Sequence, residues 1–152
     1  MNTLGIILAA GKSTRLYPTT LSVTKQLLPI YDKPLIYYSL STLMLVDIRD
    51  FMIIVSPTEL NIFSNLFKNA KEELGINITL LCQASPTGIA DAFNIVNDYL
   101  QDKVYDYENH VLILGDNIFY GHELVWVSHG KECDTPSRHS SNRCFTFNFR
   151  NG

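Results

Sequence analysis

The sequence predicts an α/β fold: a Rossmann-like, mostly parallel sheet with helices on both faces. Short, almost uninterrupted apolar runs occur along the chain at 4–10, 51–55, 78–82 and 110–114. Runs of this length and composition are typical of strands buried on both faces. Segments of helical length separate them, at 35–46, 59–74 and 90–100. A strict alternation of strand and helix indicates right-handed crossovers and a parallel sheet.

The segment 59–74 shows helical periodicity in its apolar residues. These residues are Leu60, Phe63, Leu66, Phe67, Ala70 and Leu74. The spacing predicts one amphipathic helix, with Gly75 as its C-terminal stop. Cys82 ends an apolar run and is expected in the core.

Length and composition favour a single domain with a real core, since 46% of the 152 residues are hydrophobic. No apolar run approaches the roughly 18 residues that a membrane span needs, and no basic region followed by a long apolar segment opens the chain. We therefore expect a cytoplasmic protein. A net charge of -3 argues against nucleic acid or an acidic membrane as partner. The three cysteines fit neither a disulfide framework nor a zinc site.

The first apolar run leads directly into a small, polar loop with Gly11, Ser13, Thr14 and Arg15. Parallel sheets bind ligands at the carboxyl ends of their strands, and backbone N–H groups in a turn of small residues form an anion cradle. Gly11 lets a phosphate approach without a Cβ in the way, and Arg15 adds a permanent positive charge. An ordinary surface turn is the alternative, but this combination favours phosphate binding.

Two common phosphate motifs do not fit this loop. The P-loop requires a glycine at position 6, which is Ile6, and the dinucleotide fingerprint requires glycines at positions occupied by Ser13 and Leu16. A P-loop-like NTPase is therefore only a distant alternative, although Asp116 after an apolar run would suit it.

The motifs of residues 2–124 resemble those of sugar-1-phosphate nucleotidyltransferases, and most closely the glucose-1-phosphate thymidylyltransferases. The stretches that carry this resemblance are 8–18 (LAAGKSTRLYP), 25–34 (KQLLPIYDKP) and 114–122 (LGDNIFYGH). The resemblance implies transfer of dTMP from dTTP to glucose 1-phosphate, giving dTDP-glucose and pyrophosphate with Mg²⁺. It further implies a supply of dTDP-sugars for rhamnose-type polysaccharides and a homo-oligomeric intact enzyme.

The resemblance also assigns roles to individual residues. Arg15 and Lys25 would be catalytic, acting against phosphate charge, since such chemistry depends on positioning and charge neutralisation. The implied nucleotide-binding residues are Leu8, Ala10, Gly11, Ser13, Thr14, Arg15, Gln26, Gln83, Pro86 and Gly88. For Lys25 the alternative is a solvated surface lysine.

Gln83 and Asp116 also have a rationale in the residues themselves. Gln83 carries a donor and an acceptor, which suits the edge of a pyrimidine base, and Gly88 would let a flat ring lie close to the backbone. A common strand-to-helix turn is the alternative. Asp116 follows four apolar residues and a glycine, so its carboxylate is expected at a strand's carboxyl end. There it would suit Mg²⁺ carried in with phosphates; the alternative is an aspartate that starts a turn.

The final residues differ from the rest in composition. Residues 1–123 carry a net negative charge and residues 124–152 a net positive charge. We expect 1–123 to form an incomplete nucleotide-binding core and 124–152 a poorly ordered tail, in which only Phe145, Phe147 and Phe149 could pair as a strand. The sugar-binding residues and second metal-binding carboxylate of the resembled family have no counterpart here. The second functional hypothesis is therefore a truncated, non-catalytic nucleotide-binding fragment.

Overall fold

The computed structural model describes residues 2–11, 16–21, 23–85, 88–101 and 107–119, and the backbone of 145–147. Its centre is a five-stranded sheet in the order β5-β4-β1-β6-β7. The strands are β1 (Thr3–Leu8), β4 (Asp50–Val55), β5 (Asn77–Cys82), β6 (Asn109–Leu114) and β7 (Phe145–Phe147). The first four are parallel, and β7 runs antiparallel to β6. The predicted α/β fold with a mostly parallel sheet is confirmed.

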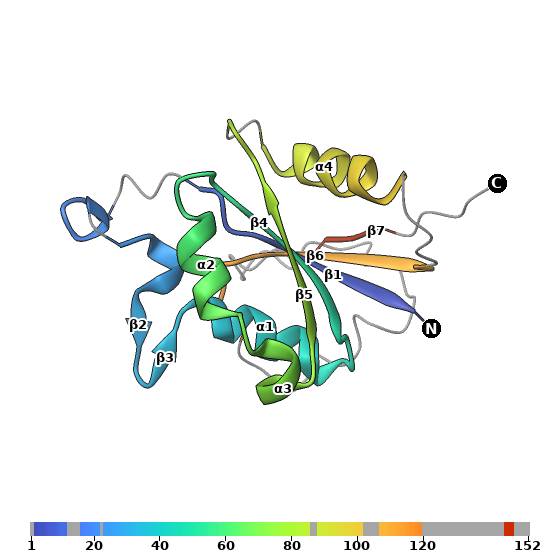
Figure 1. Ribbon diagram of the computed structural model, residues 1–152, viewed down its shortest axis with the longest axis horizontal. Coiled ribbons are helices and arrows are strands. Elements are labelled where there is room, and N and C mark those ends of the chain that lie inside the picture. The colour runs from blue at the N-terminus through green and yellow to red at the C-terminus, as the bar shows by residue number, and fades with distance from the viewer. Residues whose placement is uncertain are drawn as a thin grey trace, which may run out of the picture.

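Helices cover both faces of this sheet, as predicted (Figure 1). They are α1 (Ile36–Leu45), α2 (Leu60–Leu66), α3 (Ala70–Leu74) and α4 (Ile89–Gln101). On one face α1, α2 and α3 enclose a cluster that includes Ile7, Ile53 and Phe63. On the other face α4 packs over a second cluster that includes Ile6, Met52 and Val96. Consecutive residues of β1 therefore enter different clusters, which explains why its sequence is apolar without alternation.

The prediction of one helix over 59–74 is wrong. The segment forms α2 and α3, separated by a turn at 67–69. Asn69 stands at the N-cap position of α3, and its amide Nδ2 donates to Glu73 Oε1 at 3.2 Å. The Asn69 side chain makes no capping bond to the helix backbone, and asparagine is a weak helix former, so a break at this residue costs little. Gly75 does end α3, with a φ of 66° that L residues adopt only under strain.

Among the described residues before α1, the chain forms a small hairpin and the 3-10 turns η2 (Thr19–Leu21) and η3 (Lys25–Leu27). The hairpin pairs β2 (Pro29–Ile30) with β3 (Lys33–Pro34). Sequence reasoning missed this hairpin because its connection has no glycine: Tyr31 takes a positive φ of 62°. Tyr38 of α1 anchors it by donating its hydroxyl to Ile30 O at 2.6 Å.

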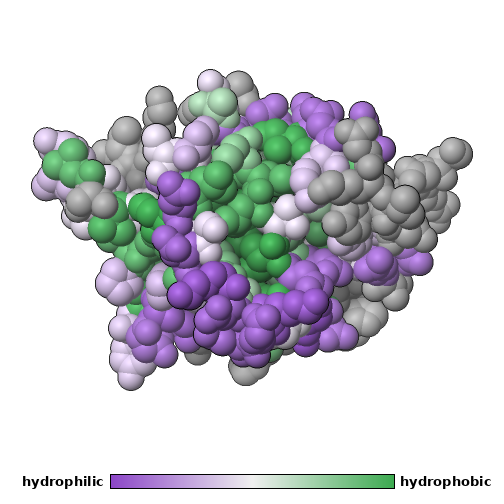
Figure 2. All heavy atoms as spheres, viewed as in Figure 1, coloured by the Kyte–Doolittle hydropathy of each residue, from purple (hydrophilic) through white to green (hydrophobic). Residues whose placement is uncertain are grey.

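β5 is an edge strand of the sheet, and its side chains are only partly covered. Ile78 and Leu80 are half-buried against the cluster on the α1–α3 face. Figure 2 shows a hydrophobic area over β5, between α2 and α4. Cys82 lies at the end of β5 and is exposed, so the expectation of a core cysteine is wrong. The apolar run could not reveal that the cover over β5 stops before its last residue.

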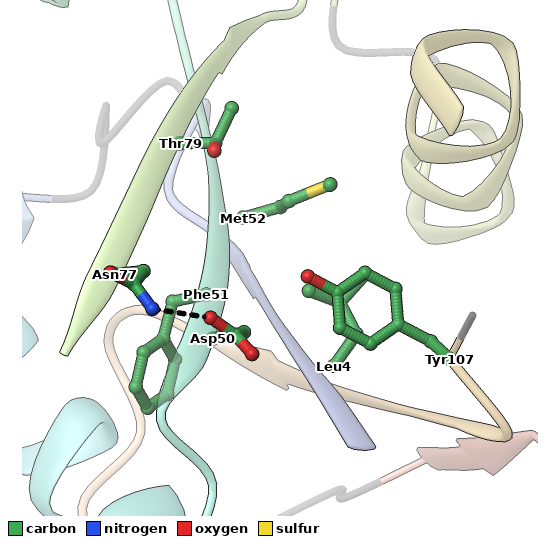
Figure 3. Close-up of a pocket in the computed structure, with 7 residues that line it drawn as sticks. All are labelled: Leu4, Asp50, Phe51, Met52, Asn77, Thr79 and Tyr107. Atoms are coloured by element: carbon green, nitrogen blue, oxygen red, sulfur yellow. Dashed lines mark hydrogen bonds between the residues drawn. The ribbon is translucent and has the colours of Figure 1, made fainter. Parts of the chain in front are cut away.

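The amino ends of β1, β4 and β5 surround a cavity of about 270 Å³. Its lining consists of Leu4, Asp50, Phe51, Met52, Asn77, Thr79 and Tyr107 (Figure 3). Asn77 Nδ2 donates to Asp50 Oδ1 at 2.7 Å and ties the starts of β5 and β4 together.

None of the helices in the described ranges combines the length and hydrophobicity that a membrane span requires.

Candidate functional site

Three of the four parallel strands, β1, β5 and β6, stay hydrogen-bonded one residue past their carboxyl ends. Ala9 N donates to Ile54 O at 2.7 Å, and Gln83 N donates to Val55 O at 2.9 Å. On the other side of β1, Gly115 N donates to Leu8 O at 2.9 Å. The segments that follow β1, β5 and β6 therefore start from one fixed edge, where parallel sheets bind ligands.

Two of the predicted site residues meet at this edge. Lys25 Nζ lies 2.6 Å from Asp116 Oδ2, although 91 positions separate them in the sequence. The two side chains remain about one-third exposed, at 32% and 30%. A cation and a carboxylate thus share one accessible point beside the end of β6, and each neutralises the other when no ligand is bound.

Gly115 packs closely against the residue that follows Lys25. A Cβ added to Gly115 would stand 3.3 Å from Gln26 Cγ and 3.3 Å from the Cβ of Ala9. Because glycine has no Cβ, η3 can pack against the turn after β6, with Gln26 only 4% exposed. Thr24 supports this arrangement by donating its hydroxyl to Gln26 Oε1 at 2.7 Å. In this structure Gln26 is therefore a buried anchor for its neighbour Lys25.

Sequence reasoning missed one residue that holds this site. Ser39 of α1 is fully buried, and its hydroxyl lies 3.0 Å from Leu114 O and 3.1 Å from Asn117 O. These carbonyls flank Asp116, so Ser39 fixes the turn that presents the carboxylate. The signal was present in the sequence: Ser39 interrupts the buried stripe of Ile36, Leu40 and Leu43 on α1. A polar residue on a buried helix face requires a partner.

Gln83 and Gly88 lie on either side of the connection from β5 to α4. Gln83 is 5% exposed, and its Nε2 donates to Asp91 Oδ2 at 2.8 Å. Gly88 is exposed and has a φ of 115°, so its backbone conformation strongly favours glycine. Pro86, between them, lies outside the described residues.

The loop after β1 is described only at its start. Leu8 and Ala10 lie at the end of β1 and just beyond it, with Ala10 buried. A Cβ added to Gly11 would meet no atom of the described residues within 4 Å, so the space beside it is open. Ser13, Thr14 and Arg15 lie outside the described residues. Their predicted phosphate contacts therefore remain predictions.

The donor set at Asp116 suits a magnesium ion that arrives with a nucleotide. Mg²⁺ is commonly held by one or two carboxylates together with phosphates and water, rather than by a complete protein cage. The described residues contain no group of three or more His, Cys, Asp or Glu side chains that could hold a metal. Asp116 supplies one hard oxygen ligand at an accessible position.

A family model described as nucleotidyl transferase matches residues 4–129. The chain belongs to the nucleotidyl transferase family. This confirms the resemblance that the motifs at 8–18, 25–34 and 114–122 indicated. The match includes β1, η3, β6 and the segments that carry Lys25 and Asp116, so the site described above lies within the part shared with this family.

The chain is similar to curated glucose-1-phosphate thymidylyltransferases of the nucleotidyl transferase family. It is 51% identical over 121 residues to the one from Xanthomonas campestris pv. campestris strain B100, covering 80% of this chain and 39% of that protein. It is 46% identical over 117 residues to the one from Mycolicibacterium smegmatis, covering 77% of this chain and 38% of that protein. The chain thus spans about 39% of the length of the first of these relatives.

Solved nucleotidyl transferase structures share the fold. A crystal structure assigned as a glucose-1-phosphate thymidylyltransferase from Bacillus anthracis, in complex with sucrose, superposes with a TM-score of 0.71 at 34% identity. That likeness covers 82% of this chain and 48% of the other. A UDP-glucose pyrophosphorylase bound to UDP-glucose gives a TM-score of 0.65 at 22% identity, covering 84% of this chain and 52% of the other, and shows the fold alone.

Proposed function

We propose that this chain carries the nucleotide-binding part of a glucose-1-phosphate thymidylyltransferase. The proposed reaction transfers dTMP from dTTP to glucose 1-phosphate, yielding dTDP-glucose and pyrophosphate. The observation that carries this proposal is the 2.6 Å contact of Lys25 with Asp116 at the carboxyl edge of the sheet. It supplies, at one point, a cation for phosphate oxygens and a carboxylate for the accompanying metal.

In the proposed chemistry an oxygen of the sugar phosphate attacks the α-phosphorus of dTTP, and pyrophosphate leaves. Negative charge gathers on the phosphate oxygens in the transition state, and a fixed ammonium group such as that of Lys25 stabilises it. Arg15 would add a second cation from the loop. Mg²⁺ held by Asp116 and phosphate oxygens would neutralise further charge.

The remaining predicted residues would hold the nucleotide. Gly11 leaves open space for a phosphate, and backbone N–H groups of the loop would complete an anion cradle. Gln83 would contact the thymine base, and Gly88 would let the ring lie against the backbone. The other proposed contacts come from Leu8, Ala10, Ser13, Thr14, Gln26 and Pro86.

We further propose the setting of this activity. Residues 1–123 carry the nucleotide-binding core, to which β7, from the tail at 124–152, adds an edge strand beside β6, and the intact enzyme is homo-oligomeric. Its product would feed dTDP-sugar synthesis for rhamnose-type polysaccharides. The cytoplasm is the proposed compartment, because dTTP and glucose 1-phosphate are charged and do not cross a membrane unaided.

A second candidate is nucleotide binding without transfer. Both contacts that the structure brings together, Lys25–Asp116 and Gln83–Asp91, suit the nucleotide. The sequence assigns no described residue to the sugar. Because catalysis depends on holding the sugar phosphate in line with the α-phosphorus, a chain that binds only dTTP would not turn over.

Calorimetric titration with dTTP and Mg²⁺, beside an assay of pyrophosphate release on adding glucose 1-phosphate, tests both candidates. The transferase predicts dTTP binding and pyrophosphate release, each reduced in Lys25→Met. The matched control is Lys68→Met, which removes an exposed lysine of the turn between α2 and α3 and should change neither. Binding without release supports the second candidate, and absence of dTTP binding contradicts both.

A further inference from the structure

The contact between Gln83 and Asp91 has a fixed direction. Gln83 is held at the end of β5 by its backbone bond to Val55 O and is almost completely buried. Asp91 lies in the first turn of α4, and its Oδ2 accepts a hydrogen bond from Gln83 Nε2 at 2.8 Å. An ionised carboxylate can only accept hydrogen bonds. The amide nitrogen of Gln83 must therefore face Asp91.

This direction decides what Gln83 can offer to a ligand. An amide side chain normally presents a donor and an acceptor, and the two ends exchange by a flip of the group. Asp91 removes that freedom, because a flipped amide would place its oxygen against the carboxylate. The group that remains is Gln83 Oε1, which forms no hydrogen bond with a described residue. Gln83 is thus preset as an acceptor.

We propose that Asp91 sets the base selectivity of this site by holding Gln83 as a hydrogen-bond acceptor, which selects bases with a ring N–H donor, such as thymine and uracil. Asp91 acts through Gln83 and is a positioning residue. The inference rests on the proposed function, in which Gln83 faces the base.

The selectivity follows from the edges of the bases. Uracil and thymine carry an N–H at ring position 3, which can donate to Oε1. Cytosine has an unprotonated nitrogen there, so two acceptors would face each other and the buried amide oxygen would stay unpaired. A glutamine with both amide groups available can pair with adenine in a bidentate manner. Gln83 cannot do so while its nitrogen is bound to Asp91.

A simpler role for Asp91 predicts a different result. An acidic residue in the first turn of a helix interacts favourably with the helix dipole, and Asp91 has that position in α4. If that were its only role, replacing Asp91 would lower stability and leave the preference among bases unchanged. Selectivity is therefore the measurement that separates the two roles.

The experiment titrates the 152-residue chain with dUTP and with dCTP in the presence of Mg²⁺. These nucleotides differ only at positions 3 and 4 of the ring and share the same phosphates. The intact chain should bind dUTP more tightly than dCTP by roughly tenfold, the usual scale for one lost hydrogen bond. Asp91→Asn should bring the ratio close to one, because asparagine can donate to Oε1 and lets the amide of Gln83 flip.

The matched control is Asp98→Asn, which changes an exposed aspartate of the same helix and should leave the ratio as it is. A folded Asp91→Asn chain with an unchanged ratio overturns the inference. A second test needs no variant: N3-methyl-dUTP lacks the donor, and the intact chain should bind it about tenfold more weakly than dUTP. Equal binding also overturns the inference. Failure to bind any of these nucleotides, or dTTP, overturns the proposed function itself.

Discussion

At the amino ends of β1, β4 and β5 polar and apolar side chains line a cavity, whereas at the carboxyl ends a lysine, two carboxylates and an amide meet in pairs. The contrast is visible along β1. A Cβ added to Gly5, in the amino half, would lie 2.8 Å from the ring of Phe51, but one added to Gly11, beyond the carboxyl end, would meet open space. One glycine leaves room for the protein's own core, and the other leaves room that a ligand could use.

This difference has a physical basis in the parallel arrangement. All four carboxyl ends open on the same edge, so the segments that follow them can converge, as η3 and the turn after β6 do at Lys25 and Asp116. The amino ends carry a cavity of about 270 Å³ whose polar contact, Asp50 with Asn77, ties two strands together (Figure 3). We therefore expect substitutions at one edge to change ligand affinity and those at the other to change stability.

The largest effect is expected for Lys25→Met at the carboxyl edge. A hydrogen bond to a charged group contributes about 1.5–3 kcal/mol, so dTTP affinity should fall on the order of tenfold to a hundredfold. The free energy of unfolding should change by less than about 1 kcal/mol, because an ion pair this exposed stabilises little. Calorimetry and urea unfolding measure the two quantities. A large loss of stability with unchanged affinity would contradict the assignment of this edge to ligand binding.

The second-largest effect, a loss of stability, is expected for Gly5→Ala near the amino end of β1. The new methyl group would overlap the ring of Phe51, which is 2% exposed. Such overpacking costs about 1–3 kcal/mol, so the urea midpoint should fall clearly. The affinity of the folded chain for dTTP should stay the same. An unchanged midpoint would show that the core adapts at this position.

Gly11→Ala should lower dTTP affinity and leave stability almost unchanged, which is the reverse of the result expected for Gly5→Ala. Gly11→Ala meets no described atom within 4 Å, so stability should change by less than about 0.5 kcal/mol, as for ordinary surface substitutions. The methyl group would occupy the space proposed for a phosphate, and dTTP affinity should fall about fivefold, or about 1 kcal/mol. If affinity is unchanged, the phosphates do not pass close to Gly11.

The smallest effect depends on pH and involves His110 near the amino end of β6. Burial lowers the pKa of His110 below its ordinary value of 6.5. As the pH falls, His110 therefore takes up a proton in the unfolded chain before it does so in the folded chain. The contribution of neutral His110 to the free energy of unfolding is complete above about pH 6.5. It decreases below that pH until the pKa of His110 in the folded chain is reached. The melting temperature of the intact chain should fall between pH 7.5 and pH 5.5, and that of His110→Gln should fall by less. An identical pH response in the two proteins would exclude His110 as a contributor.

The local elements follow from the sequence because each depends on short-range chemistry. The four apolar runs became β1, β4, β5 and β6, within a few residues of the expected bounds. Gly75 ends α3 because it alone pays no steric penalty at a positive φ. The motif spacing also identified the family, since the residues that carry it lie in three short stretches.

Other features were decided only by the tertiary structure, because they depend on partners far apart in the sequence. The salt bridge between Lys25 and Asp116 needs η3 to pack on Gly115, and the acceptor role of Gln83 needs α4 to return over the end of β5. The exposure of Cys82 depends on where the helices over β5 stop. Residue types indicate which chemistry is available, but the docking of separate segments determines which groups meet and which way each one faces.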